Sequence, residues 1–303
     1  MSLLVIYNPY SGRWNALKKK QEVEDALNRA GVKYELILTE GPGHAMDLAA
    51  RAVNQGFDTV IAAGGDGTIS EVVNGLAVAS ENLLKDRALG PLGIIPLGSA
   101  NDMVDNLGLP KDIDEAAKVI ASGNTKLIDL CKVNNRYFDN NSAIGLEPFI
   151  TLIQQRIKRL KGTSRYLVAT LMGVYANPSW KMRLTWENGD YYGPITLVTV
   201  GNSPRTGGVF YVTPHANPCD GLLTFVFGFM PTRRQTLQLL PRTMKPGRGN
   251  YVEHPDIHEI NTPWLKINSE TPTPMHADGE IQSEAILDLD YTILPERLSV
   301  LVN

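Results

Sequence analysis

Four short apolar runs, each followed by a turn or loop that contains glycine, are the feature that most constrains the fold of this chain. A short continuous apolar run is typical of a strand that is buried on both faces of a parallel sheet. The runs are LLVIY (3–7), YELIL (34–38), TVIAA (59–63) and PLGIIPLG (91–98). Segments that contain a helical pattern alternate with them, at residues 15–30, 41–56, 68–77, 99–110 and 112–123. This alternation predicts an α/β domain with a parallel sheet and helices on both of its faces.

The pattern changes after about residue 130. Alternating and aromatic-rich runs, such as ITLVTVGNS and AILDLDYTIL, are then separated by turn residues, which is typical of antiparallel strands. Two helical stretches interrupt them, at 148–176 and at about 232–244. We therefore expect an α/β domain over residues 1–130 and a mostly antiparallel β domain over residues 131–291. The sequence leaves open whether residues 292–303 return to the first domain as a strand.

The composition and the charge exclude several classes of protein. A formal net charge of −3 over 303 residues argues against a dedicated nucleic-acid binder. Cys131 and Cys219 form neither a metal-spaced pair nor a disulfide framework. The sequence shows no signal-peptide pattern and no run of about 18 apolar residues, so we expect a cytoplasmic protein without a membrane span.

The loops at the four strand ends carry the main functional signal. The carboxyl ends of parallel strands meet at one edge of a sheet, which is where such sheets bind ligands. Glycine-rich loops before a helix favour an anion, so we expect a phosphorylated ligand. No common phosphate-binding or dinucleotide-binding glycine motif is present. For the third loop alone, a tight turn capped by Thr68 is an equally good interpretation. The loops are NPYSG (8–12), TEGPG (39–43), GGDGT (64–68) and PLGSAND (96–102).

An acid inside an anion-binding loop needs an explanation, because Asp66 would repel a phosphate. It is compatible with a cation that neutralises the phosphate, or with a contact to a sugar hydroxyl or a loop amide. Asp102 lies at the next strand end, so both carboxylates are expected to face one cleft. Oxygen ligands that leave open positions suit Mg²⁺ shared with a nucleotide.

Together with HADGE (276–280), these motifs resemble those of the soluble bacterial diacylglycerol kinase family. The catalytic domain of that family is shared with sphingosine and ceramide kinases. The resemblance covers most of the chain, and the motifs fit in order and spacing. It implies an N-terminal α/β domain like that of phosphofructokinase and NAD kinase, followed by a C-terminal β-sandwich. It also implies that ATP and a lipid alcohol meet in the cleft between them, with diacylglycerol as acceptor.

The resemblance also implies roles for residues at the matching positions. Asp66 and Asp102 would organise the catalytic magnesium and the nucleotide, and Glu280 would be the general base, with Asp278 beside it. Ser99 stands where the family commonly has threonine, which preserves the hydroxyl. Nucleotide contacts are implied for Asn8, Pro9, Tyr10, Ser11, Gly12, Thr39, Gly64, Gly65, Asp66, Gly67, Thr68, Glu71, Gly98, Ser99 and Asn101.

A structural magnesium is known in some members, near a turn that is NPCDGLL here. The resemblance then implies Asp220, the carbonyl of Leu222, and Asn217 in place of a common lysine as its ligands. His276 adjoins the proposed base, and the sequence leaves open whether it supports the site or lies in a solvated loop.

Two basic stretches, 156–165 and 233–248, contain no acid. The simple interpretation is a solvated helix face. The alternative is docking on a membrane, because residues 149–171 mix apolar side chains with five cations, as an interfacial helix does. We thus expect transient contact with the inner face of the membrane. Competing functions are a related kinase with a soluble acceptor, such as NAD or a sugar phosphate, and a non-catalytic nucleotide-binding regulator. The choice of lipid and the oligomeric state stay open.

Overall fold

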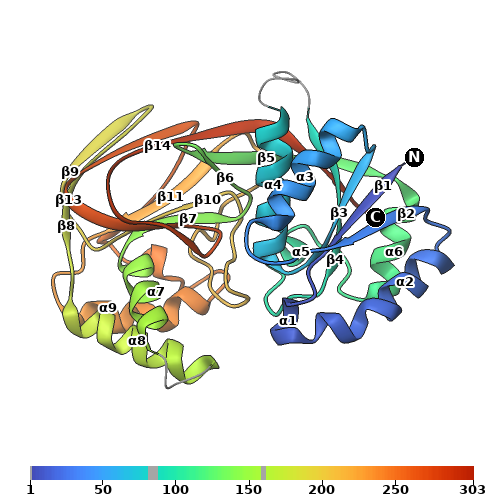
Figure 1. The fold of residues 1–303 in the computed structure, drawn as a ribbon. Coiled ribbons are helices and arrows are strands. Elements are labelled where there is room, and N and C mark those ends of the chain that lie inside the picture. The colour runs from blue at the N-terminus through green and yellow to red at the C-terminus, as the bar shows by residue number, and fades with distance from the viewer. Residues whose placement is uncertain (1, 81–87, 158–161) are drawn as a thin grey trace.

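The computed structural model describes residues 2–80, 88–157 and 162–303, and it divides into an α/β half and a β-rich half (Figure 1). The α/β half has four parallel strands in the order β2-β1-β3-β4. They are β1 (Leu3–Tyr7), β2 (Tyr34–Leu38), β3 (Thr59–Gly64) and β4 (Leu89–Pro96). Its helices are α1 (Ser11–Trp14), η1 (Ala16–Lys19), α2 (Lys20–Arg29), α3 (His44–Gln55), α4 (Asp66–Ser80), α5 (Asp102–Asn106) and α6 (Ile113–Ser122).

The β-rich half is built mostly from antiparallel pairs, so the predicted fold class is confirmed. Its strands are β5 (Thr125–Val133), β6 (Arg136–Phe138), β7 (Asn141–Gly145), β8 (Trp180–Trp186), β9 (Gly189–Ile195), β10 (Leu197–Gly201), β11 (Leu223–Gly228), β12 (Ile257–Thr262), β13 (Trp264–Ala277) and β14 (Glu280–Leu301). Its helices are α7 (Leu146–Arg156), α8 (Gly162–Ala176), α9 (Arg233–Leu239), η2 (Leu240–Met244) and η3 (Tyr251–Glu253).

The 22-residue strand β14 joins the two halves. It pairs antiparallel with β13 and β5, and its last residues then run parallel to β4, with Leu298 opposite Leu89. The end of the chain thus returns to the α/β half as a strand, which the sequence left open. Both halves therefore belong to one continuous sheet.

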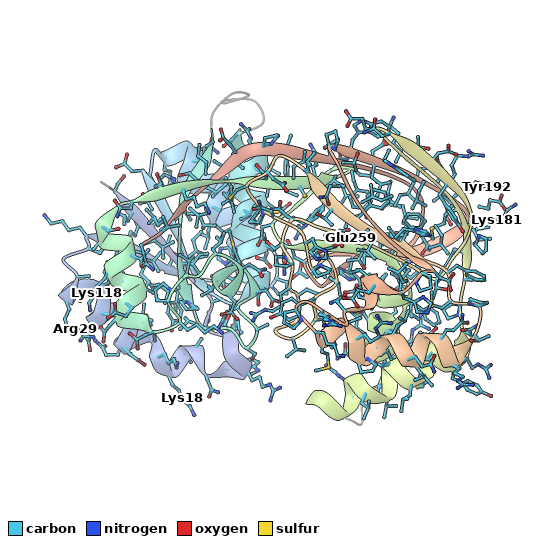
Figure 2. All side chains as sticks on the ribbon, turned by 180° about the vertical axis from the view of Figure 1, so that it is seen from behind. Lys18, Arg29, Lys118, Lys181, Tyr192 and Glu259 are labelled. Atoms are coloured by element: carbon cyan, nitrogen blue, oxygen red, sulfur yellow. The ribbon has the colours of Figure 1, made fainter. Side chains whose placement is uncertain are left out.

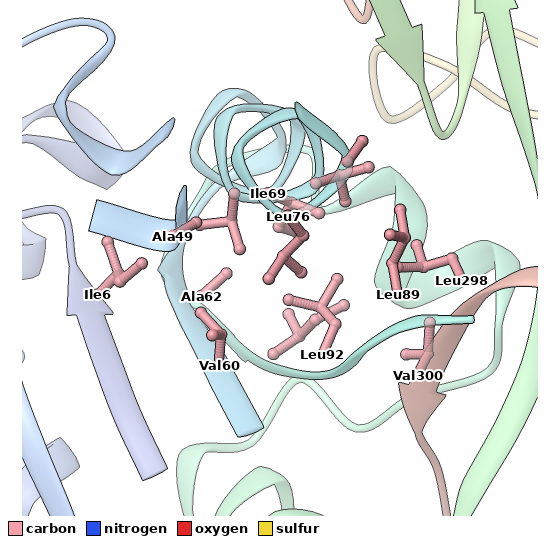
Figure 3. Close-up of a cluster of buried hydrophobic side chains, with 14 of the residues drawn as sticks. Ile6, Ala49, Val60, Ala62, Ile69, Leu76, Leu89, Leu92, Leu298 and Val300 are labelled. Atoms are coloured by element: carbon pink, nitrogen blue, oxygen red, sulfur yellow. The ribbon is translucent and has the colours of Figure 1, made fainter. Parts of the chain in front are cut away.

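The two faces of the parallel strands are covered by different helices. On one face, Ala49 of α3 and Ile69 and Leu76 of α4 pack onto β3, β4 and the end of β14 (Figure 3). Gly75 allows this packing, because a Cβ there would lie 2.2 Å from the carbonyl oxygen of Met46. On the other face, α2 and α6 cover the sheet with a second apolar cluster.

The outer surfaces of both halves carry charged side chains (Figure 2). Arg29 of α2 lies 2.5 Å from Asp114 of α6, and both side chains are largely exposed. Such a surface pair contributes little to stability. The packing of α2 and α6 on the sheet therefore depends on their apolar faces.

Two helix predictions need correction. The helix expected at 68–77 begins two residues earlier, at Asp66, because the carbonyl of Gly65 accepts hydrogen bonds from the N–H groups of Thr68 and Ile69. The stretch 148–176 forms two helices, α7 and α8, and residues 158–161 lie outside the described part of the chain. A single interfacial helix over 149–171 is therefore wrong. Its first residues face inward, since Ile150 is buried and the Phe149 ring lies 6.3 Å from that of Trp180.

Candidate functional site

The loops at the ends of the first three strands, together with one residue of β14, line a cleft of about 570 Å³. Nine of the predicted site residues are part of its lining: Asn8, Tyr10, Ser11, Thr39, Gly65, Gly67, Thr68, Glu71 and Glu280. The other lining residues are Trp14, Glu40, Gly41, Pro42 and Ala45. The cleft therefore joins the strand ends of the α/β half to the proposed base.

Several predicted residues lie behind the cleft and shape its loops. A Cβ on Gly98 would lie 2.6 Å from the Cα of Gly65, so these two glycines let two loops pass each other closely. Gly12 has a φ of 59°, and a Cβ there would lie 2.6 Å from the carbonyl oxygen of Leu97. These glycines thus make room for the protein's own backbone. The predicted residues of the α/β half that are absent from the cleft lining are Pro9, Gly12, Gly64, Asp66, Gly98, Ser99, Asn101 and Asp102.

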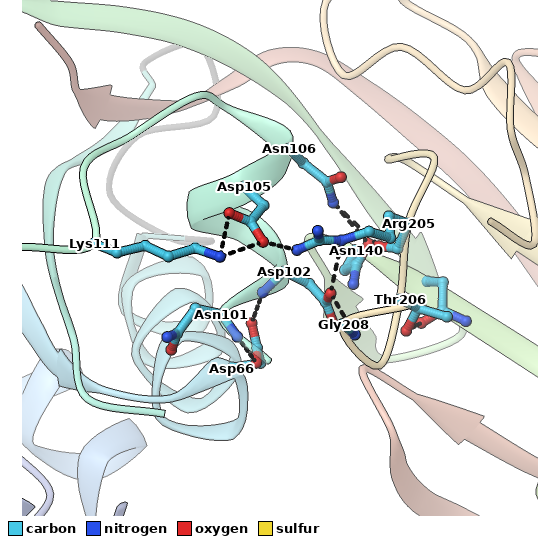
Figure 4. A network of polar contacts seen from close by, with 11 residues as sticks. Asp66, Asn101, Asp102, Asp105, Asn106, Lys111, Asn140, Arg205, Thr206 and Gly208 are labelled. Carbon is cyan, nitrogen blue, oxygen red and sulfur yellow. Dashed lines mark hydrogen bonds and ion pairs between the residues drawn. The ribbon is translucent and has the colours of Figure 1, made fainter. Parts of the chain in front are cut away.

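The carboxylate of Asp66 binds the backbone of the fourth loop (Figure 4). It accepts hydrogen bonds from the N–H groups of Asn101, at 2.9 Å, and Asp102, at 2.5 Å. We call this pair of hydrogen bonds the loop clasp. Of the roles considered for Asp66, contact with a loop amide is the one that the geometry displays.

Asp102 is buried and links the two halves. Its Oδ1 accepts a hydrogen bond from the N–H of Gly208 at 2.9 Å and lies 3.4 Å from Nε of Arg205. Burial raises the pKa of Asp102, the negative charge of Asp66 adds to the rise, and Arg205 opposes it. The charge of Asp66 thus lies close enough to disfavour the ionised form of Asp102.

Glu71 lines the cleft, as its predicted nucleotide contact requires, and its carboxylate also binds the backbone of the second loop. Its carboxylate accepts hydrogen bonds from the N–H groups of Gly43, at 2.8 Å, and Ala45, at 3.1 Å. It therefore holds the second loop at the start of α3 while also lining the cleft. Asn8 similarly donates through Nδ2 to Oγ1 of Thr68 at 2.9 Å, which joins the first and third loops.

Asp278 positions the turn that presents Glu280. It has a φ of 47°, and its carboxylate accepts hydrogen bonds from the N–H groups of residues 139–141, at 3.4, 3.1 and 3.2 Å. Asp139 is buried against it, and burial together with the charge of Asp278 raises the pKa of Asp139 well above its usual range. Asp139 therefore favours its protonated form beside Asp278.

Glu280 faces a cation that sequence reasoning missed. Its Oε2 lies 3.5 Å from Nη2 of Arg136, and the same nitrogen lies within 3.4 Å of Oγ of Ser70. Nε of Arg136 is buried and has no hydrogen-bond partner among the described residues. Burial raises the pKa of Glu280, whereas Arg136 opposes the rise. A lone arginine after a turn carries no motif, so no sequence signal marks it.

The turn predicted to hold a second magnesium is exposed, and its side chains bind their own backbone. Oδ1 of Asp220 accepts a hydrogen bond from the N–H of Leu222 at 3.0 Å, and Oδ1 of Asn217 accepts one from that of Cys219 at 3.2 Å. Buried Asp129 fastens this turn, since its Oδ2 accepts a hydrogen bond from the N–H of Gly221 at 2.7 Å. Asp129 is a second residue that the sequence did not mark.

His276 is buried, so a solvated loop position is wrong. Its Nε2 lies 3.0 Å from Oε1 of Glu147, and Nδ1 has no partner among the described residues. This pair joins α7 to the end of β13, just before the turn that carries Asp278 and Glu280.

Comparisons with known proteins agree with this architecture. The sequence matches the family description "Diacylglycerol kinase catalytic domain" over residues 2–133, and "YegS C-terminal NAD kinase beta sandwich-like domain" over residues 141–302. It is 30% identical over 278 residues to a diacylglycerol kinase of Staphylococcus saprophyticus subsp. saprophyticus, which is 91% of this chain and 88% of that protein. It is 32% identical over 278 residues to one of Staphylococcus haemolyticus, which is 91% and 81% of the two chains.

A solved structure extends the similarity to three dimensions. The crystal structure of a diacylglycerol kinase from Bacillus anthracis str. Sterne matches with a TM-score of 0.78 at 25% identity, over 100% of this chain and 97% of that one. None of the helices in the described residues combines the length and apolar character needed to cross a bilayer. The family implies ATP as the phosphate donor. The chain belongs to the diacylglycerol kinase family and is a phosphotransferase with an alcohol group as acceptor.

Proposed function

We propose that this chain transfers the γ-phosphoryl group of ATP to the hydroxyl of diacylglycerol, with Mg²⁺, to give phosphatidic acid. One observation carries the proposal: Glu280, from the β-rich half, lies over the glycine-rich loop of the other half. A Cβ on Gly67 would lie 3.4 Å from Oε1 of Glu280. A carboxylate so placed is suited to accept the proton of a hydroxyl that attacks a phosphoryl group in the loop.

The phosphates of ATP would lie against the loop of residues 65–68 at the start of α4. Backbone N–H groups at the N-terminus of this 15-residue helix favour an anion there. Asn8 and Thr68 hold the neighbouring loop in place, and Thr39 completes the wall of the cleft. The predicted nucleotide contacts of these residues stay proposals, supported by their position in one cleft.

The residues present fit a magnesium ion shared with the nucleotide. Asp66 and Asp102 lie close together, and each of their carboxylates keeps acceptor capacity beyond its backbone hydrogen bonds. Mg²⁺ in kinases is commonly held by one or two carboxylates plus phosphate oxygens and water. When bound, it would neutralise charge between these carboxylates and the phosphates. No group of three or more His, Cys, Asp or Glu side chains in the described residues forms a metal site of its own.

We propose that Arg136 contacts the transferred phosphoryl group. The cleft lining of the described residues contains no lysine or arginine, and Arg136 lies next to the proposed base. Its buried Nε–H has no hydrogen-bond partner among the described residues, so part of its donor capacity is unused. Arginine that stabilises charge during phosphoryl transfer is a recurring device in kinases and GTPases. Asp278 would act as a positioning residue, because it fixes the turn before Glu280.

A lipid acceptor implies that the reaction takes place at a membrane surface. We therefore propose a cytoplasmic protein that contacts the inner face of the membrane transiently. A second magnesium at Asn217, Asp220 and Leu222 stays a prediction. Metal-dependent thermal stability that is lost in Asp220→Ala and kept in the wild type would support it.

The test is transfer from radiolabelled ATP with Mg²⁺ to a panel of acceptors in mixed micelles. The panel contains diacylglycerol, phosphatidylglycerol, a sphingoid base and an undecaprenyl-type alcohol, with NAD as a soluble acceptor. We expect labelled phosphatidic acid from the wild type and a decrease of about 10²–10⁴-fold in Glu280→Gln.

Glu284→Gln is the matched control, because Glu284 lies on the same strand with a largely exposed side chain. It should keep wild-type activity. Label in NAD alone would contradict the lipid assignment. Equal activity of Glu280→Gln and wild type would contradict the assignment of the base.

A further inference from the structure

Helix α8 exposes large apolar side chains to solvent. The exposed fractions are 58% for Leu167, 51% for Leu171, 51% for Met172 and 71% for Tyr175. At about 3.6 residues per turn, these four positions fall within one arc of about 140°. A contiguous exposed apolar surface of this kind marks an interaction site.

The rest of the α8 surface already packs against the protein. Ala169 and Val174 are buried, and a Cβ on Gly173 would lie 2.6 Å from Cγ1 of Ile150 in α7. The helix is therefore apolar on both sides, although only one side is covered. A helix that is apolar all round is typical of a buried environment, so the exposed side requires a partner that excludes water.

The charges near this exposed side are positive. The guanidinium of Arg233 lies 4.3 Å above the ring of Tyr175, and Arg234 beside it is exposed. The sequence has no acidic residue in 148–186 or in 221–252, whereas the whole chain has a net charge of −3. An apolar stripe with arginines at its edge is complementary to an anionic lipid surface.

The position of α8 suits such a contact. It forms the lower edge of the β-rich half in Figure 1, and it stays at the lower edge in the reversed view of Figure 2. Helix α1, which contributes Ser11 and Trp14 to the cleft, lies at the lower edge of the other half. A flat surface that contacts α8 would therefore lie on the same side of the molecule as α1.

We propose that α8 docks on an anionic bilayer. Leu167, Leu171, Met172 and Tyr175 enter the boundary between headgroups and acyl chains, while Arg233 and Arg234 contact lipid phosphates. The proposal rests on the proposed function, since it explains how the cleft reaches an acceptor embedded in a membrane. It names a surface other than residues 149–156 of α7, whose apolar residues Phe149 and Ile150 are used in packing.

The experiment measures binding of the full chain to vesicles of phosphatidylcholine, with and without phosphatidylglycerol, by flotation. The variant Leu171→Gln/Met172→Gln should lose at least about tenfold in binding to anionic vesicles, because two side chains no longer bury apolar area. Arg233→Gln/Arg234→Gln should weaken binding to anionic vesicles only, and added salt should reduce the difference.

The matched control is Leu127→Gln/Leu287→Gln, on β5 and β14, since both leucines are 43% exposed. This control should bind like the wild type. Thermal unfolding verifies that each variant is folded. Equal binding by the α8 variant and wild type, or an equal loss in the control, would overturn the proposal. A wild type that is dimeric in solution, and becomes monomeric in the α8 variant without a change in vesicle binding, would assign the surface to a second copy of the chain.

Activity separates this proposal from the proposed function. With a short-chain diacylglycerol that dissolves as monomers, the α8 variant should transfer phosphate like the wild type. With long-chain diacylglycerol in anionic vesicles, its kcat/KM should decrease about as much as its binding. A wild type that phosphorylates no lipid would refute the proposed function alone, and the flotation result would still decide the role of α8.

Discussion

The loop clasp gives Asp66 a structural role that can be separated from metal binding. Each hydrogen bond to a charged acceptor contributes about 1.5–3 kcal/mol, and the Asp66 carboxylate accepts two, at 2.9 and 2.5 Å. In Asp66→Asn, the amide oxygen keeps one neutral bond of about 1 kcal/mol and the NH₂ group faces the second N–H donor. Because Asp66 is only half-buried, we discount the difference for solvent screening and expect a loss of about 2 kcal/mol.

The assay is urea unfolding in excess EDTA, without nucleotide, so that no metal contributes. Asp190→Asn is the control, because that side chain is 63% exposed and forms a surface pair with Arg183. It should change the free energy of unfolding by less than about 0.5 kcal/mol. An Asp66→Asn variant as stable as wild type in EDTA would refute the reasoning and leave metal binding as the main role of Asp66.

Three further predictions concern pH and packing. Burial raises the pKa of Glu280, whereas Arg136 opposes the rise. A general base works only when it is deprotonated, so kcat/KM should fall as pH decreases through that pKa. Arg136→Gln should move this decrease in kcat/KM to higher pH, and an unchanged pH profile would contradict the contact between Arg136 and Glu280. Burial raises the pKa of Asp139 well above its usual range, so the folded protein loses stability as pH rises above the pKa of the unfolded chain. Asp139→Asn should raise the free energy of unfolding in urea by at least about 1 kcal/mol near pH 8 and leave it unchanged below about pH 3.9. An equal increase at both pH values would refute this. Gly75→Ala places a Cβ 2.2 Å from the carbonyl oxygen of Met46 and should cost about 1–3 kcal/mol in thermal unfolding; wild-type stability would contradict the close packing of α3 on α4.

The parts of the fold that follow a simple period could be predicted from the sequence. The first strands are continuous apolar runs, and the structure places β1 and β2 at 3–7 and 34–38, as predicted. The two-helix arrangement at 146–176 could not be derived, because a run of mixed apolar and basic residues has the same composition in one helix or two. Only packing shows that Phe149 and Ile150 face inward while Leu171 faces solvent.

The candidate site was predictable where several loops share one edge of a sheet. Sequence alone could not tell which glycines approach a ligand and which approach another loop, as Gly65 and Gly98 do. It also could not find Arg136 or Asp139, because each matters through a partner more than 65 positions away in the chain. These partners are brought together by the packing of the two halves against each other, which leaves no local pattern in the sequence.

The position of Glu280 follows from the strand that it begins. From Glu280, β14 runs along β13 and β5 to β4, and the carboxylate of Asp129 fastens the bend by accepting the N–H of Glu296 at 2.8 Å. One hydrogen-bonded sheet thus connects the proposed base to the strand that leads into the loop with Asp102. Such a connection holds a site more precisely than a contact between two mobile domains would. Helices α7, α8 and α9 lie outside this ladder, so a change of acceptor or of lipid surface among relatives should be found there, while the strands that position the base stay unaltered.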